Sequence, residues 1–166
     1  MKKTNLSDYD PKAVPSGKGR RIAVVAAEWN PEVTDAMLKG AVDTLRENGV
    51  EEDGLEVYRV PGTFELTTAA EQILNRRNID AVICIGCVIQ GETHHFEFIC
   101  QAVSQGLTNV AIKHSRPVIF SVLTCDTMQQ ALDRAGGKHG NKGVEGAITA
   151  LKMIALSSAI EYELPF

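Results

Sequence analysis

The chain is poor in aromatic residues and has no long apolar run, and these absences limit what it can be. Phe, Trp and Tyr together make up 5% of the 166 residues. Because no run of about 18 apolar residues occurs, we expect no membrane-spanning helix. The formal charge is −4 and the basic residues form no stripe, which argues against a nucleic-acid-binding surface. Lys2 and Lys3 follow the first Met as in the basic start of a signal peptide, but no apolar stretch comes after them, so we expect a cytoplasmic protein.

Cysteine is also scarce, and its four positions do not suggest a metal site or a disulfide. Cys84 and Cys87 match C-x-x-C formally, but they lie in an apolar segment typical of a strand, where residues three apart point to opposite faces. We therefore predict buried thiols. His94 and Glu97 share a helix face, yet no third ligand at a suitable spacing is nearby, so we expect no metal.

Apolar runs and helical stripes alternate along the chain. Strands are predicted over residues 22–27, 55–60, 81–85 and 117–123. Helices are predicted from residue 31 to a stop at Gly49, and over 63–76, 96–114, a short stretch after Thr127, and 144–160. This alternation is typical of an α/β three-layer sandwich with a parallel sheet and right-handed crossovers. Residues 1–20 are polar and contain Pro and Gly, which predicts a flexible arm before a single domain over 21–166.

The segment Gly86–Phe98 links the most apolar predicted strand to a helix. Free N–H groups and the positive end of a helix dipole meet at such a junction and favour an anion. The spacing approaches that of a P-loop, but Glu92 stands where a lysine is needed, so we exclude nucleoside triphosphates. A small anion such as a phosphate monoester and a plain strand-to-helix turn both remain open. His95 is a candidate general acid/base or a capped, half-buried histidine.

Two further strand-to-helix junctions carry candidate ligand-binding residues. Trp29, the only tryptophan, follows the first strand and could stack on a planar heterocycle or make a core contact. Asn30 is a predicted N-cap and Pro31 a favourable first helical residue. In the segment Thr63–Glu65, the Glu65 carboxylate could accept from ligand hydroxyls or amines, or simply favour the helix dipole.

Residues 134–143 form a basic, glycine-rich loop in an acidic protein. Such a loop suits anion capture by flexible backbone together with Arg and Lys, although a surface connector with solvated cations has the same composition. The helix that follows contains many small residues, which fit close packing, including packing against another subunit.

Four segments give the chain a specific resemblance over about residues 21–160. They are Trp29–Asn30, Val60–Glu65, Gly86–Phe98 and Arg134–Gly143. Together, and in this order, they resemble the lumazine synthase family (6,7-dimethyl-8-ribityllumazine synthases of riboflavin biosynthesis). The resemblance implies a flavodoxin-like fold with a four-stranded parallel sheet. It also implies condensation of 5-amino-6-(D-ribitylamino)uracil with 3,4-dihydroxy-2-butanone 4-phosphate to the lumazine, phosphate and water, with no metal or organic cofactor.

The resemblance also implies a role for each matching residue. His95, not His94, falls on the catalytic histidine of the family. The ribitylaminouracil would be held by the aromatic Trp29 (usually Phe in the family) and by Thr63, Phe64, Glu65, Cys87, Val88, Ile89 and a neighbouring subunit's Phe120. The butanone phosphate would be received by Glu92, Thr93 and a neighbouring subunit's Arg134, with Lys138 and Lys142 as supporting cations.

The sequence departs from the family pattern at two positions and leaves rival functions open. Glu92 adds a negative charge beside the phosphate, so its side chain should point away, and Gln90 stands where a basic residue is common. One rival is an archaeal-type riboflavin synthase, whose reaction releases no phosphate and needs no Arg134. Another is a non-catalytic flavin- or lumazine-binding shell protein, against which the presence of both His95 and Arg134 argues.

A site shared between subunits implies self-association. The resemblance implies pentamers as the unit, and the short segment from Gly136 to Gly143 resembles members in which twelve pentamers build a sixty-subunit icosahedral shell.

Overall fold

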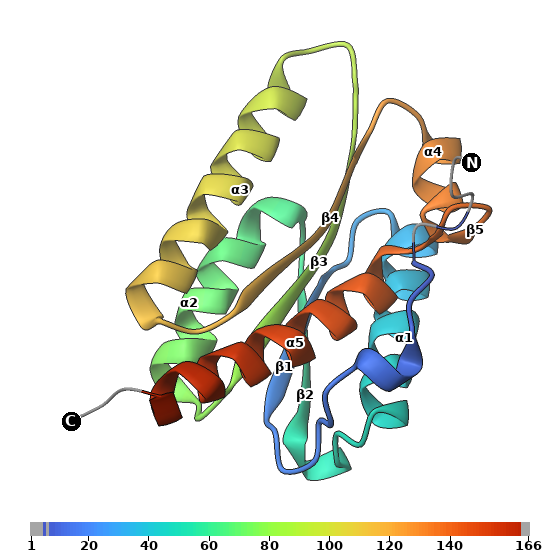
Figure 1. The fold of residues 1–166 in the computed structure, drawn as a ribbon. Coiled ribbons are helices and arrows are strands. Elements are labelled where there is room, and N and C mark those ends of the chain that lie inside the picture. Colours follow the sequence, from blue (N-terminus) through green and yellow to red (C-terminus); the bar gives the residue numbers. More distant parts are fainter. Residues whose placement is uncertain (1–4, 6, 164–166) are drawn as a thin grey trace.

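The protein folds as a parallel β-sheet between two layers of helices (Figure 1). The computed structural model describes residues 5 and 7–163, so parts of the predicted arm (1–4 and 6) and the last residues of the predicted domain (164–166) lie outside the described residues. The sheet has four strands in the order β2-β1-β3-β4, all parallel, which confirms the predicted α/β class. Its elements are β1 (Ile22–Ala27), α1 (Pro31–Glu47), β2 (Leu55–Val60), α2 (Leu66–Arg76), β3 (Ala81–Ile89), α3 (His95–His114), β4 (Val118–Cys125), α4 (Met128–Asp133), β5 (Ala135–Gly137), β6 (Gly140–Asn141) and α5 (Lys142–Glu163).

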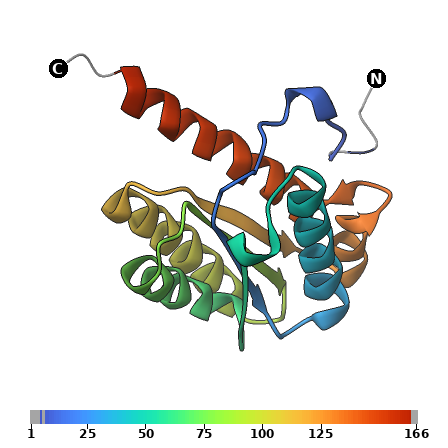
Figure 2. The same ribbon diagram turned by 90° about the horizontal axis from the view of Figure 1, so that it is seen from below.

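The central strands are buried on both faces because their apolar runs are continuous. Residues such as Val24 and Ile83 face the core under α1 and α5, whereas Val25 and Val82 face the core under α2 and α3. Figure 2 shows these layers end-on. The four cysteines are free thiols, and Cys84 and Cys87 lie in opposite cores as their spacing predicted.

Strand β3 is longer than predicted, because Gly86 is part of the strand and not of a loop. A Cβ on Gly86 would lie 2.6 Å from Oγ1 of Thr63. The glycine therefore permits a close approach between β3 and the short 3-10 turn Thr63–Glu65 that precedes α2. Strand β4 begins at Val118, directly after Pro117, and runs on to Cys125.

The predicted flexible loop at residues 134–143 is a structured hairpin. Strands β5 and β6 pair antiparallel, and α5 starts at Lys142, two residues earlier than predicted. Asn141 caps α5, since its Oδ1 accepts the N–H groups of Gly143 (2.8 Å) and Val144 (3.3 Å). The backbone around the cations is thereby fixed.

The N-terminal segment, as far as it is described, lies along α1 and α5 (Figure 1). Gly17 is buried, and its N–H donates to the carbonyl of Asn48 at 2.8 Å. Ser7 reaches the hairpin and the first turn of α5, where its Oγ lies 2.9 Å from Oε1 of Glu145.

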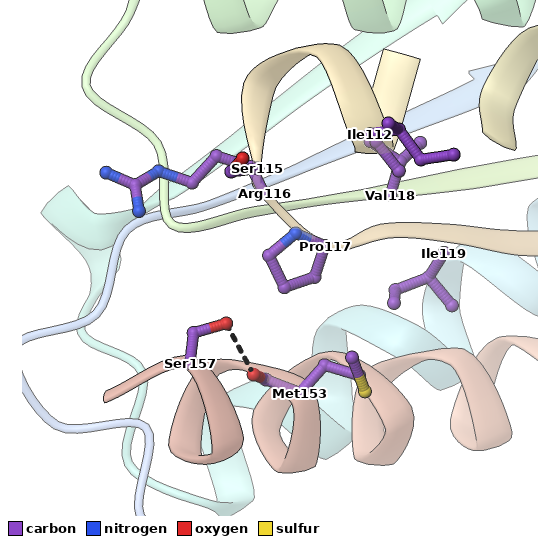
Figure 3. Close-up of a pocket in the computed structure, with 9 residues that line it drawn as sticks. Ile112, Ser115, Arg116, Pro117, Val118, Ile119, Met153 and Ser157 are labelled. Atoms are coloured by element: carbon purple, nitrogen blue, oxygen red, sulfur yellow. Dashed lines mark hydrogen bonds between the residues drawn. The ribbon is translucent and has the colours of Figure 1, made fainter. Parts of the chain in front are cut away.

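Helix α5 is long and apolar enough between Lys142 and Glu161 to cross a membrane, judged by length and composition only. One face accounts for much of that composition, because Ala147, Leu151 and Ile154 are buried in the core shared with α1. The other face carries exposed Met153, Leu156 and Ile160. A cavity of about 380 Å³ adjoins this face, between the end of α3, the start of β4 and α5 (Figure 3).

Candidate active site

The carboxyl ends of β1, β2 and β3 bring one set of predicted residues together. Trp29 follows β1, the turn Thr63–Glu65 follows β2, and the segment Cys87–Ile89 ends β3. Oγ1 of Thr63 donates to the carbonyl of Cys87 at 3.4 Å, and a Cβ on Gly62 would touch the Trp29 ring at 2.6 Å. We call this set the aromatic half-site: Trp29, Thr63, Phe64, Glu65, Cys87, Val88 and Ile89.

Asn30 does not cap α1 with its side chain, which corrects the sequence prediction. It occupies the N-cap position in the left-handed region (φ 59°, ψ 53°) and makes no side-chain cap bond. Its Nδ2 instead donates to the carbonyl of Cys87 at 3.1 Å. Asparagine tolerates this backbone conformation better than most residues, and the amide ties the end of β1 to β3. The sequence indicated Asn30 only as a helix cap, whereas in the structure its side chain is part of the candidate site.

The two aromatic rings of this half-site are open to solvent. Trp29 is 66% exposed and Phe64 is 54% exposed. Glu65 is held beside them, because its Oε2 accepts the N–H of Gly62 at 3.0 Å. Exposed rings next to a fixed carboxylate can stack on a flat heterocycle and accept hydrogen bonds from its substituents.

Cys87 contributes structure and not a nucleophile. Burial raises the pKa of its thiol to about 12, and the nearby Cys125 adds to that effect. A thiol with this pKa is protonated at neutral pH and unreactive. Its carbonyl is bound by Asn30 and Thr63, so the backbone that remains for a ligand is that of half-buried Val88 and Ile89.

His95 is the first residue of α3 and directly follows the loop that connects β3 to α3. Glu92, Thr93 and His95 are all exposed, and the His95 N–H lies 3.4 Å from Oγ1 of Thr93. A helix of 20 residues starts here, so its unpaired N–H groups and dipole favour an anion beside the imidazole. His94 lies 3.7 Å from Glu97, and in the described part of the chain no third His, Cys, Asp or Glu joins them as a metal ligand.

A second set of predicted residues, which we call the cation half-site, consists of Arg134, Lys138 and Lys142. Lys138 pairs with Asp133 at 2.9 Å. Arg134 and Lys142 share the carboxylate of Glu145, at 2.7 Å and 3.1 Å. The alternative of a surface connector with solvated cations does not fit Arg134, whose side chain is only 17% exposed. Sequence analysis missed Glu145, although its position three residues after Lys142 on a helix is a recognisable ion-pair spacing.

Among residues 5 and 7–163, no hydrogen bond or ion pair links a residue of one half-site to a residue of the other. Phe120 lies on β4, an edge strand of the sheet, is 38% exposed and pairs in register with Cys84. Cys84 precedes Cys87 by three residues, so Phe120 lies about 10 Å along the sheet from the level of Cys87.

Comparison with known proteins gives the family of the chain. The family model for 6,7-dimethyl-8-ribityllumazine synthase matches residues 19–158. The 6,7-dimethyl-8-ribityllumazine synthase of Porphyromonas gingivalis is 56% identical over 152 residues, which cover 92% of this chain and 94% of the relative. The corresponding protein of Cytophaga hutchinsonii is 54% identical over 151 residues (91% and 94%), and that of Bacteroides fragilis is 50% identical over 134 residues (81% and 94%). The chain therefore belongs to the 6,7-dimethyl-8-ribityllumazine synthase family, enzymes of riboflavin biosynthesis.

Proposed function

We propose that the protein condenses 5-amino-6-(D-ribitylamino)uracil with 3,4-dihydroxy-2-butanone 4-phosphate at a site shared by two copies, in the cytoplasm and without metal or organic cofactor. The observation that supports the shared site is that no hydrogen bond or ion pair among the described residues links the two half-sites within one chain. The aromatic half-site and His95 would come from one copy. Phe120 and the cation half-site would come from its neighbour.

The chemistry gives each half-site a task. The 5-amino group condenses with the ketone to form an imine and release one water, phosphate leaves by elimination, the resulting enol tautomerises to a carbonyl, and ring closure on that carbonyl releases a second water. Trp29 and Phe64 would stack on the pyrimidine while Glu65 accepts from the ribityl hydroxyls. His95 would move protons between steps. Arg134, supported by Lys138 and Lys142, would favour the departing phosphate, with Glu92 directed away from it and Thr93 beside it.

The direct test is formation of the lumazine. Purified protein is mixed with both substrates in metal-free buffer, and lumazine absorbance is followed above the spontaneous background. Catalysis supports the proposed reaction. A protein that binds flavin or lumazine without any rate above background would instead be a binding or shell protein. Conversion of lumazine to riboflavin would identify the riboflavin synthase alternative.

A shared site predicts that two defective variants rescue each other. His95→Ala lacks a group of one half-site and Arg134→Ala lacks a group of the other, so a ring of mixed copies contains some neighbours that together are intact. Random 1:1 mixing in a heterologous ring should restore about a quarter of the wild-type sites. The measurement is the activity of co-expressed variants against each variant alone. If mixing restores nothing above the sum of the two backgrounds, each site lies within one chain.

Self-association is further supported by exposed apolar side chains beside the edge strand β4. Ile112 is 72% exposed, and Leu156 and Ile160 on α5 are about half exposed. Surfaces of this kind are typical of subunit interfaces. We propose that a second copy covers them, that pentamers are the unit, and that twelve pentamers form a shell. For an 18.0 kDa chain, a sedimentation mass of about 1.1 MDa would support the shell, whereas about 90 kDa would leave a lone pentamer.

Gly62→Ala should selectively weaken binding of the ribitylaminouracil. The new Cβ would lie 2.6 Å from Cε3 of Trp29 and 3.0 Å from Oε2 of Glu65, so the ring must move away from its present place. We expect the KM for ribitylaminouracil to rise about tenfold while the KM for butanone phosphate is unchanged. Because Trp29 is the only tryptophan, its fluorescence reports the displacement directly. Wild-type quenching by the ligand together with an unchanged KM would contradict the stacking role.

A further inference from the structure

Glu145 connects three segments of the chain through one carboxylate. Its Oε1 accepts from Nη2 of Arg134 at 2.7 Å and from Oγ of Ser7 at 2.9 Å. Its Oε2 accepts from Nζ of Lys142 at 3.1 Å. Burial alone would raise the pKa of Glu145, but hydrogen bonds from Arg134, Lys142 and Ser7 outweigh it, and the pKa lies below its ordinary value. The carboxylate is therefore ionised at neutral pH.

Ser7 holds this carboxylate from the N-terminal segment. Its hydroxyl accepts the N–H of Asn141 at 2.6 Å and has its one proton available for Glu145 or for the Asn141 carbonyl at 3.1 Å. Gly140 has a positive φ of 87°, and a Cβ there would lie 2.3 Å from Oγ of Ser7. The segment thus rests directly on the β5–β6 hairpin, at a point where only glycine leaves room.

Among the described residues, Arg134 uses only two of its N–H donors in hydrogen bonds. A guanidinium carries five N–H groups. One is donated to Glu145, and Nη1 donates another to the carbonyl of His139 at 2.6 Å. Among residues 5 and 7–163 the other three donors have no hydrogen-bond partner, and they are enough for a forked contact with a phosphate. Glu145 therefore does not block Arg134, but it fixes the plane of the guanidinium and keeps two like charges, Arg134 and Lys142, side by side.

We propose that Glu145 is a positioning residue for the phosphate-ester half of the site, and that Ser7 in turn fixes Glu145. The inference rests on the proposed role of Arg134 in holding the phosphate of the butanone substrate. Through Ser7, the N-terminal segment thereby influences how tightly the enzyme binds butanone phosphate. Glu145 acts through Arg134 and Lys142 and touches no reacting atom.

The test is the change in the two Michaelis constants in Glu145→Gln, which keeps the size of the side chain and removes its charge. We expect the KM for butanone phosphate and the inhibition constant of inorganic phosphate to rise about tenfold, because the cation pair loses its alignment. The KM for ribitylaminouracil should not change. Glu145→Asp, which keeps the charge, should recover part of the loss. The matched control is Glu52→Gln, which breaks the exposed Glu52–Arg46 pair (2.8 Å) and should change neither constant.

Ser7→Ala removes the hydrogen bond from Ser7 to the ionised Glu145 and the acceptor for the Asn141 N–H. It should shift the same two constants in the same direction by about threefold, less than Glu145→Gln, because Arg134 and Lys142 still hold the carboxylate. Ser16→Ala is its control, because among the described residues that hydroxyl has one hydrogen-bond partner, the local N–H of Lys18. An unchanged KM for butanone phosphate in Glu145→Gln would overturn the proposal, because Glu145 would then have no effect on phosphate binding. A lower KM would also overturn it, because Glu145 would then compete with the phosphate for Arg134. A rise in both KM values with a lower unfolding temperature would also overturn it, in favour of a structural role.

Arg134→Ala, measured in parallel, separates this inference from the function beneath it. If Arg134→Ala raises the KM for butanone phosphate and Glu145→Gln does not, only the proposed role of Glu145 is refuted. If Arg134→Ala leaves that constant unchanged, the phosphate site itself is misassigned and the role of Glu145 falls with it.

Discussion

Arg134→Ala is expected to lower kcat/KM for butanone phosphate by about 10³-fold, the loss typical of removing one preorganised donor from developing negative charge. Arg134 is half-buried and is oriented by Glu145 and the carbonyl of His139, and its three other N–H groups have no partner in the described part of the chain. The guanidinium of Arg134 is therefore already oriented before the substrate binds. Steady-state kinetics with each substrate varied in turn would measure the effect, which should concentrate on the phosphate substrate.

His95→Ala should be the milder change, with a loss of about 10²-fold, the lower end of what a positioned acid/base contributes. The imidazole is exposed at the start of α3, so water can take over part of its proton transfers. Arg134→Lys is a useful further variant, because lysine keeps the positive charge but cannot make the two parallel hydrogen bonds of a guanidinium. Equal and complete loss in Arg134→Ala and His95→Ala would show that proton transfer limits the rate as much as phosphate handling does.

The sequence predicted the layers of the fold because the physical signals for them are local. The run Ile22–Ala27 is apolar at every position, and in the structure every residue of β1 is buried. The opposite facing of Cys84 and Cys87 followed from strand geometry alone. The predicted strand-to-helix junctions at Trp29 and Thr63 do meet at one edge of the sheet, because parallel strands end together.

What the sequence did not predict depends on contacts between distant segments. Gly86 has the appearance of a loop residue, and only its closeness to Thr63 explains a glycine inside β3. Asn30 has the ordinary signature of a cap, but the end of β3 lies close enough to take its amide. The pairing of Arg134 with Glu145 spans eleven positions and a hairpin, so composition suggested a loose cationic loop where the fold holds a fixed one.

Gly143→Ala is expected to lower the unfolding temperature substantially, because α5 begins where its backbone nearly touches α1. A Cβ on Gly143 would lie 1.8 Å from the carbonyl oxygen of Met37 and 2.6 Å from its carbonyl carbon. Both are backbone atoms, so no side-chain rotation relieves the clash and one helix must move. Overpacking of this kind costs about 3 kcal/mol, which for a domain of this size corresponds to about 6–12 °C. Thermal unfolding at one fixed protein concentration measures it, since assembly makes the midpoint concentration-dependent.

The same substitution tests how the fold positions the cations. Lys142 precedes Gly143 and Glu145 follows it within the first turn of α5, so a shift of that turn also displaces the partners of Arg134. We expect the KM for butanone phosphate to rise together with the loss of stability, while the KM for ribitylaminouracil stays nearer its wild-type value, because Trp29 and Glu65 lie on other elements. Gly91→Ala is the control for stability, since a Cβ there meets no atom within 4 Å. A Gly143→Ala protein that unfolds at the wild-type temperature would mean that α1 and α5 separate freely, and the cation half-site would then lack the rigid support on which its chemistry is argued.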